Sequence, residues 1–308
     1  MKIAGIVAEY NPFHTGHAYQ IACTRAQLGE DCAVAAVMSG HWVQGGRPAI
    51  ADKWTRTRLA LLGGADLVLE LPTVWAVSSA ETFARGAVGL LAAAQVVDVL
   101  SFGSRLAEGG TPGAAARQRA VEGLLGPELA GLLSTPNNNL GVEYIRALDR
   151  LNHNIRPMTI RREGAPHDSL MRGAERPRFC SATQLRAFLE GEDWAALAPY
   201  LPKNGLEVLR AGWSGPSLER AERGLLARLR TMTAEDWANI PDSGAGEGLP
   251  PRLERAGAQC RTLGEFIALA KPKHWTQARM RRLLVWAWLG LTREDRPGPP
   301  PPKPRGGV

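Results

Sequence analysis

Short apolar runs bounded by turn residues recur along the first half of the chain. Five of them have the length and β-branched content of buried strands: residues 2–10 (KIAGIVAEY), 32–40, 65–71, 96–103 and 156–162. The segments between them place apolar residues at helical spacing, as in DKWTRTRLALLGG at 52–64 and SSAETFARGAVGLLAAA at 78–94. Strands that alternate with helices predict an α/β fold with a Rossmann-like parallel sheet and helices on both faces.

The pattern changes in the second half of the chain. Residues 105–115 are typical of a surface loop, residues 134–141 of a turn that opens a helix, and a further helix begins at about Ser181. Only helical periodicity follows, and six tryptophans there are interpreted mainly as core residues. We therefore predict a nucleotide-binding domain over residues 1–190, a smaller basic helical domain over 191–292 and a disordered Pro/Gly-rich tail over 293–308.

Net charge and cysteine content indicate which partners and which compartment this protein is suited to. The 308 residues carry a net charge of +7, with a sequence pI near 9.6, which is compatible with a polyanionic partner. The four cysteines are far apart and form no CxxC motif, so we expect free thiols in a cytoplasmic protein and no zinc site. We expect no signal peptide, because the chain starts directly on a strand, and no membrane span, because no apolar run approaches about 18 residues.

The stretch EYNPFHTGH at residues 9–17 stands where the first strand gives way to a helix. Such a turn lies at the carboxyl edge of a parallel sheet, where ligands bind. A helix N-terminus attracts phosphate, Gly16 allows close approach of the backbone, and His14 and His17 can project the same way to stabilise charge in adenylyl transfer. The alternative is a pair of ordinary helix-capping histidines. A zinc site is disfavoured because no third ligand is nearby.

Several ordered blocks carry a resemblance to a known family. They are GIVAEYNPFHTGHAY (5–19), VMSGHWVQGGRPAIADKWTRTRLALLGGADLVLELP (37–72), SFGS (101–104), PNNNLGVEYIRAL (136–148), IRREGAPHD (160–168), CSATQLR (180–186) and KHWTQARMRRLLVWAWLGL (273–291). Together they resemble the tRNA(Met) cytidine acetate ligase family of the HxGH nucleotidyltransferase superfamily. Family members typically continue with a further small domain beyond the position of Leu291.

The resemblance implies an activity. A ligase of this family uses ATP, with Mg²⁺ accompanying it, and acetate to make acetyl-adenylate, and then acetylates N4 of the wobble cytidine of elongator tRNA(Met). It implies His14 and His17 as catalytic residues. The ATP-binding residues that it implies are Val7, Ala8, Glu9, Tyr10, Asn11, Pro12, Phe13, His14, Thr15, Gly16, His17, Ala18, Tyr19, Gln20, Gly103, Asn137, Arg162, Ser181, Thr183 and Arg186.

Physical roles can be assigned to these positions. Gly103 would let the adenine or ribose lie flat, Asn137 offers a donor and an acceptor, and Arg162 could clamp phosphate. Ser181, Thr183 and Arg186 resemble a second phosphate site at a helix start. Plainer readings stand beside them: Asn137 as a turn or capping residue, and Arg162 as a solvated strand end.

The basic charge is concentrated near the end of the chain. Residues 252–305 hold twelve cations and four anions, a net charge of +8, which an ATP pocket would not need and an RNA partner would. The predicted tRNA-binding residues are Lys271, Lys273, Arg279, Arg281 and Arg282, and Trp275 could stack on a nucleotide. Two rival functions remain open: another adenylyltransferase acting on a small phosphate ester, and a non-catalytic, nucleotide-responsive RNA-binding protein. The sequence leaves the oligomeric state open.

Overall fold

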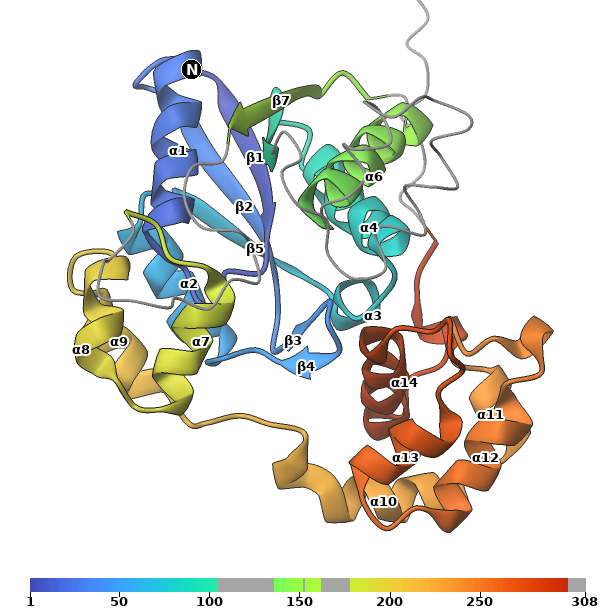
Figure 1. The fold of residues 1–308 in the computed structure, drawn as a ribbon. Coiled ribbons are helices and arrows are strands. Elements are labelled where there is room, and N and C mark those ends of the chain that lie inside the picture. The colour runs from blue at the N-terminus through green and yellow to red at the C-terminus, as the bar shows by residue number, and fades with distance from the viewer. Residues whose placement is uncertain (105–135, 152, 162–177, 299–308) are drawn as a thin grey trace, which may run out of the picture.

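A five-stranded parallel sheet forms the centre of the molecule (Figure 1). The computed structural model describes residues 1–104, 136–151, 153–161 and 178–298. The strands lie in the order β5-β2-β1-β6-β7, and every neighbouring pair is parallel. Their bounds are β1 Ile3–Ala8, β2 Ala33–Ser39, β5 Leu67–Leu71, β6 Val99–Ser104 and β7 Arg156–Arg161. The predicted α/β fold class is confirmed, and each strand falls within an apolar run of the sequence except β6, which extends one residue beyond its run.

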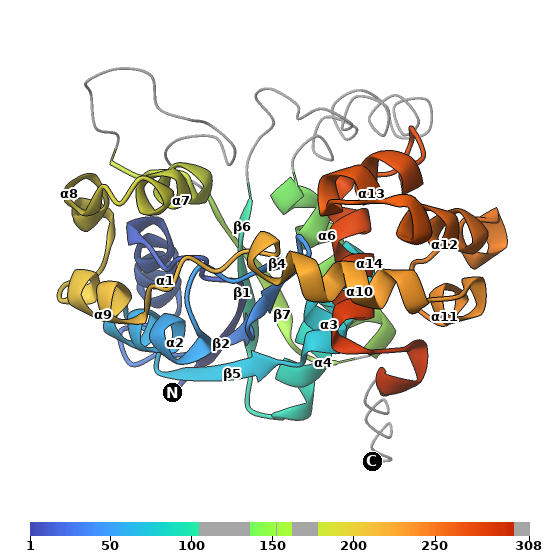
Figure 2. The same cartoon turned by 90° about the horizontal axis from the view of Figure 1, so that it is seen from below.

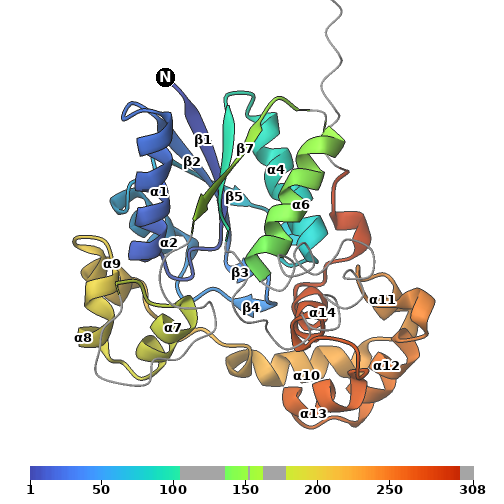
Figure 3. The ribbon, with the colours of Figure 1, turned by 45° about the horizontal axis from the view of Figure 1, so that its top comes forward.

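Helices cover both faces of this sheet, as Figure 3 shows. On one side α1 (Thr15–Leu28) and α2 (Lys53–Leu62) enclose a core that includes Ile21, Val34 and Leu59. On the other side α3 (Thr73–Ala76), α4 (Ala80–Ala93) and α6 (Pro136–Leu151) enclose a second core. Because β2 is buried on both faces, it is apolar throughout except at its last residue, Ser39, as expected of a central parallel strand.

Side chains at the helix starts explain where several of these helices begin. The Asp52 carboxylate accepts from the Thr55 backbone amide at 2.8 Å, and Ser181 Oγ accepts from the Gln184 amide at 3.1 Å. Such caps satisfy amides that have no partner within the helix. The helix predicted from about Ser181 is thereby confirmed as α7 (Ala182–Glu190).

The described part of the chain beyond residue 191 contains only helical elements, as predicted. Figure 2 shows two groups on either side of a small hairpin, β3 (Trp42–Val43) and β4 (Arg47–Pro48). One group comprises α7, α8 (Trp194–Leu197) and α9 (Gly205–Gly212), which pack beside α2. The other comprises α10 (Glu222–Thr231), α11 (Ala234–Ala238), α12 (Pro250–Gln259), α13 (Leu263–Ala270) and α14 (Gln277–Leu289). The domain boundary at residue 190 stays a prediction.

The second helical group is joined to the α3 segment of the sheet domain by specific contacts. Its core includes Trp237, Phe266 and Trp286, and the Trp286 indole donates to the Val77 carbonyl at 2.7 Å. Residues 293–295 form a short 3₁₀ helix, and Arg296 donates from Nε to the Val74 carbonyl at 3.0 Å. The start of the predicted disordered tail is therefore ordered, because these polar contacts hold it. Residues 299–308 lie outside the described residues, as does the predicted loop at 105–115.

Candidate nucleotide-binding site

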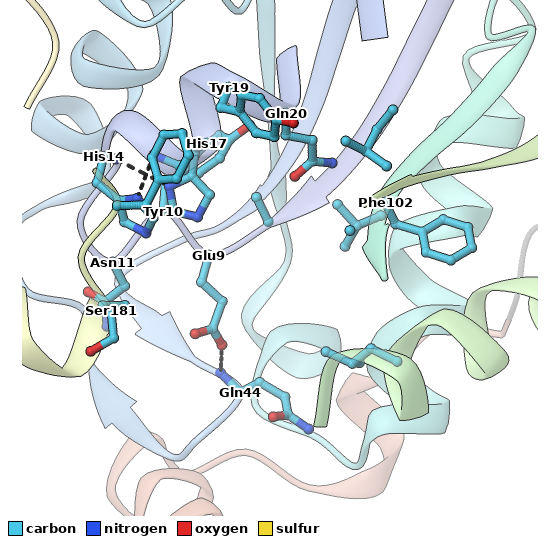
Figure 4. Close-up of a pocket in the computed structure, with 18 of the residues that line it drawn as sticks. Glu9, Tyr10, Asn11, His14, His17, Tyr19, Gln20, Gln44, Phe102 and Ser181 are labelled. Atoms are coloured by element: carbon cyan, nitrogen blue, oxygen red, sulfur yellow. Dashed lines mark hydrogen bonds between the residues drawn. The ribbon is translucent and has the colours of Figure 1, made fainter. Parts of the chain in front are cut away.

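A cavity of about 380 Å³ opens at the carboxyl edge of the sheet, where the strand-to-helix turns meet (Figure 4). The end of β1 and the start of α1 form its centre. Segments from β6, β7, α6, the β3–β4 hairpin and the start of α7 complete the wall. Its described lining residues are Val7, Ala8, Glu9, Tyr10, Asn11, His14, Gly16, His17, Tyr19, Gln20, Gln44, Gly45, Phe83, Phe102, Gly103, Leu140, Tyr144, Ile160, Arg161, Phe179, Cys180, Ser181, Ala182 and Arg186.

His14 and His17 cap the first turn of α1 reciprocally. The Nδ1 atom of His14 accepts from the Gly16 amide at 3.0 Å, and the Nδ1 atom of His17 accepts from the His14 amide at 3.2 Å. A Cβ atom at Gly16 would lie 2.8 Å from His14 Cε1, so this turn requires glycine. The capping reading of the two histidines is therefore correct as a description of their structural role.

The same hydrogen bonds set the tautomer of both rings. Because each Nδ1 is an acceptor, a neutral ring carries its proton on Nε2. The ring centroids are 3.9 Å apart, and the Tyr10 ring meets the His17 ring edge-on at 4.9 Å. His14 is only 5% exposed. The site thus holds two fixed Nε2–H donors at a helix N-terminus, an arrangement suited to phosphate oxygens.

A second polar wall comes from the start of α7. The Arg186 guanidinium donates to the Asn11 carbonyl at 3.2 Å and to Thr183 Oγ1 at 2.9 Å, while Ser181 caps the helix. The side chain of Asn11 in turn accepts from the Ile50 amide at 2.6 Å. These contacts bring the N-termini of α1 and α7 to the same cavity although they are far apart in the sequence.

The opposite wall is largely apolar. Phe102 meets Tyr144 edge-on with ring centroids 5.7 Å apart, and Gly103 follows Phe102 near the end of β6. Burial, and then the nearby Glu9 charge, raise the pKa of Tyr144. The cavity therefore has a polar end at the two helix starts and an apolar, aromatic end at β6 and α6, which fits a nucleotide with its phosphates at the helices.

Most of the predicted ATP-binding residues line this cavity, but some do not. Phe13 is fully buried in the core, Pro12 is buried as well, and Thr15, Ala18 and Thr183 are also absent from the lining. The Asn137 backbone lies in the first turn of α6, but its side chain is outside the described part, and so is Arg162. Their assignments stay predictions.

The predicted tRNA-binding residues differ in accessibility. Lys273 is exposed, whereas Lys271 and Arg279 are half-buried. Arg281 donates from Nε to the Gly45 carbonyl at 3.1 Å, and Arg282 lies 3.5 Å from the Gln44 carbonyl. Burial, with Arg47 and Arg282 nearby, lowers the pKa of Arg281 to about 10. Both arginines therefore hold the hairpin.

The proposed stacking role of Trp275 is wrong. This side chain is only 4% exposed, and the Arg279 guanidinium lies 3.1 Å from its ring centroid. Its indole nitrogen donates to the Glu247 carboxylate at 3.1 Å. Trp275 is a core residue, as expected for most of the tryptophans.

Sequence reasoning missed the hairpin residues Gln44 and Gly45, and it missed Arg56. The fully buried Arg56 guanidinium donates to the backbone carbonyls of Glu9, Ser39, Gly40 and Ala51. It thereby ties the ends of β1 and β2 together under the cavity. A signal was present, since Arg56 shares the apolar face of α2 with Leu59 and Ala60. A charge on such a face indicates a buried, hydrogen-bonded group.

Among the described residues, no group of three or more His, Cys, Asp or Glu side chains is arranged to hold a metal ion. Nor is any described helix long and apolar enough to cross a membrane. All four cysteines are free thiols, as the sequence predicted.

A parallel sheet with a histidine-capped helix at its carboxyl edge defines a nucleotide-binding α/β protein of the nucleotidyltransferase class. In agreement, the model of the HIGH Nucleotidyl Transferase family matches residues 1–111 and 105–298. Two relatives named tRNA(Met) cytidine acetate ligase are similar over 96% of this chain and 79% of their own length. They come from Thermoanaerobacter sp. (strain X514), at 35% identity, and Caldanaerobacter subterraneus subsp. tengcongensis, at 36% identity.

Two solved structures of Thermotoga maritima TmcAL share the fold. The complex with alpha-thio ATP has a TM-score of 0.80 at 31% identity, covering 96% of this chain and 76% of the other. The apo form has a TM-score of 0.83 at 32% identity, covering 96% and 77%. The chain belongs to the tRNA(Met) cytidine acetate ligase family, as its sequence motifs predicted.

Proposed function

We propose that this protein uses ATP to activate acetate as acetyl-adenylate and then acetylates N4 of the wobble cytidine of elongator tRNA(Met). The observation that carries the proposal is the similarity, over 96% of the chain, to a protein crystallised with an ATP analogue. The relatives named as ligases for this tRNA support the choice of substrate. Such an enzyme works with cytoplasmic tRNA, so we place it in the cytoplasm.

The two ends of the cavity suggest how ATP binds. Its phosphates would lie at the starts of α1 and α7, near His14, His17 and Arg186, and its ribose and adenine would extend toward Gly103. The predicted contacts of Asn137 and Arg162 belong to the same proposal. The Nε2–H groups of the two histidines would donate to the α-phosphate oxygens as negative charge builds up on them.

The chemistry then proceeds in two steps. An acetate oxygen attacks the α-phosphorus, and pyrophosphate leaves. The N4 nitrogen of cytidine attacks the acetyl carbon of the resulting adenylate, and AMP leaves. In both steps the protein supplies positioning and fixed hydrogen-bond donors.

We expect Mg²⁺ to accompany ATP. Among the described residues of the cavity wall, Glu9 is the only carboxylate, and no cluster of metal-binding side chains is present. This donor set does not fit a dedicated protein site for the ion. Phosphate oxygens and water would hold it instead, as is common for Mg²⁺ with nucleotides.

The helical group α10–α14 is proposed to bind the tRNA, with Lys271, Lys273, Arg279, Arg281 and Arg282 as its basic residues. Their contacts divide them, since Arg281 and Arg282 also hold the hairpin at the cavity. An exposed cation such as Lys273 would attract the RNA phosphates directly. Arg281 and Arg282 would contribute by holding the hairpin in place.

Mass-spectrometric nucleoside analysis tests the proposed function. Unmodified tRNA incubated with the protein should contain N4-acetylcytidine only when both ATP and acetate are present. Acetylation without added acetate would contradict the proposal. So would the absence of acetylation when the protein is given tRNA, ATP and acetate together. Adenylyl transfer to a small phosphate ester would favour the first rival function, and tRNA binding without chemistry would favour the second.

A further inference from the structure

The Glu9 side chain is the least explained group in the cavity wall. It follows β1 directly and is half-buried. Its Oε1 atom accepts from the Gln44 backbone amide at 2.7 Å, and its backbone carbonyl accepts from Arg56 at 2.5 Å. Figure 4 shows the carboxylate extending away from His17 toward the hairpin. The hairpin therefore orients the side chain, and α2 holds the backbone of the same residue.

The resemblance places Glu9 in the ATP-binding segment, but the chemistry of ATP and acetate does not call for its carboxylate. Phosphates bound near His14 and His17 carry negative charge, and acetate is itself an anion, so a carboxylate facing either would be repulsive. The ribose and adenine are proposed to lie toward Gly103, whereas the Glu9 carboxylate is directed at Gln44 and away from Phe102 (Figure 4). The hairpin wall with Glu9 is thus left for the remaining substrate, the cytidine.

The position of the hairpin supports this assignment. Gln44 and Gly45 line the cavity, and their carbonyls contact Arg282 and Arg281 on α14. A Cβ atom at Gly46 would lie 2.4 Å from the Arg282 backbone nitrogen, so the hairpin tip is packed directly against that helix. The proposed tRNA-binding helices therefore reach the cavity at Glu9 and Gln44.

On the basis of the proposed function, we propose that Glu9 is a catalytic residue. Its carboxylate would accept a hydrogen bond, and then a proton, from the N4 amino group of the target cytidine. A carboxylate accepts a hydrogen bond from the cytosine N4–H₂ group and is repelled by the O4 acceptor at the same position of uracil. Glu9 would therefore also select cytidine over uridine.

The transfer step can be written so that it balances. The N4 lone pair forms the bond to the acetyl carbon, and the bond from that carbon to the AMP oxygen breaks with its electron pair on the phosphate. The N4 proton passes to the Glu9 carboxylate and is lost to water when the products leave. No further reactant is required.

The test separates the two half-reactions in the Glu9→Gln variant, which keeps an oxygen for the Gln44 amide. We expect acetate-dependent exchange of labelled pyrophosphate into ATP, and trapping of the acetyl group by hydroxylamine, to continue at the wild-type rate. Transfer to tRNA should fall by about 10²–10⁴, the usual contribution of a general base. Glu30→Gln, the same change at an exposed site beyond the other end of α1, should leave both steps unchanged.

Other outcomes would overturn the proposal in recognisable ways. A weaker exchange reaction with a raised KM for ATP would assign Glu9 to the adenine amine, and one with a raised Mg²⁺ requirement would assign it to the metal. Unchanged transfer would remove Glu9 from the chemistry. A wild-type protein with neither exchange nor transfer would overturn the proposed function, and the role of Glu9 with it.

Discussion

Arg281 on α14 donates a hydrogen bond from Nε to the carbonyl oxygen of Gly45, at 3.1 Å, across 236 positions of sequence. This contact joins the basic helix to the hairpin that borders the nucleotide cavity. The basic residues of this region therefore fall into two groups. Arg281 and Arg282 on α14 support the hairpin at the cavity, whereas Lys273, before the helix, is exposed to solvent.

Lys273→Glu should weaken tRNA binding without disturbing the fold, because Lys273 is exposed. Removing one phosphate contact should lower the slope of log affinity against log salt concentration by about one unit or less. Filter binding over a series of salt concentrations measures this slope. An unchanged slope would place the RNA elsewhere.

Arg281→Glu should behave differently. It removes the donor to Gly45 and buries a carboxylate near the carbonyls of the hairpin, so Gln44 and Glu9 lose support. We expect transfer of the acetyl group to tRNA to fall, while acetate-dependent pyrophosphate exchange continues. Unchanged transfer at saturating tRNA would show that the hairpin does not depend on α14.

His17→Ala and His17→Gln together separate capping from catalysis. Alanine removes half of the reciprocal cap and should cost about 0.5–2 kcal/mol of unfolding free energy. Glutamine at this position of a helix start can accept from the cap amide and should restore most of that stability. Both variants should lose about 10²–10³ in turnover, because each lacks the imidazole donor. Urea unfolding and acetylation rates are the measurements, and wild-type turnover in the glutamine variant would limit His17 to capping.

Arg56→Met should destabilise the protein strongly. The methionine leaves four buried carbonyls without their donor, and we expect a loss of about 3 kcal/mol or more. Arg58→Met on the same helix is the matched control, because Arg58 is exposed. Its effect should stay within about 0.5 kcal/mol. Equal losses in urea unfolding would show that the buried guanidinium contributes nothing specific.

Cys180 should make stability depend on alkaline pH. Burial raises the pKa of its thiol from 9.0 to about 11. The contribution of this thiol to the free energy of unfolding is therefore complete below pH 9, where the thiol is protonated in both the folded and the unfolded chain. That contribution is lost between pH 9 and 11, where the thiol ionises in the unfolded chain only. Wild type should lose more unfolding free energy between pH 8 and 10.5 than Cys180→Ala does, and equal losses would argue against the shift.

ATP should slow hydrogen exchange in residues 7–20 and at Gly103 and Asn137, because these segments stand at strand ends or helix starts around the cavity. Helix α12 (Pro250–Gln259), in the core of the second helical group, provides an internal control and should be unaffected. Mass spectrometry of peptic fragments measures both. Equal protection of α12 would indicate a global effect and not a local site.

The amino-acid sequence by itself determined the five strands of the parallel sheet, the helices between them and the sheet edge at which the cavity lies. Apolar runs such as AVAAVMS and helical spacing in α4 depend only on neighbouring residues, so they can be read locally. The parallel order of the strands then places the turn holding His14 and His17 at the carboxyl edge, whatever the details of packing. The family motifs led to the same conclusion.

Only the tertiary structure decided which polar groups meet. The hydrogen bond from the Gln44 amide to Glu9 spans 35 positions, and those from Arg281 and Arg282 to the hairpin span more than 230. No local periodicity carries such pairings, because they depend on how preformed elements pack. A basic side chain looks the same in sequence whether it faces RNA, as proposed for Lys273, or donates to a carbonyl of the hairpin, as Arg281 does. The difference is made by burial, which removes water and leaves the backbone oxygen as the partner.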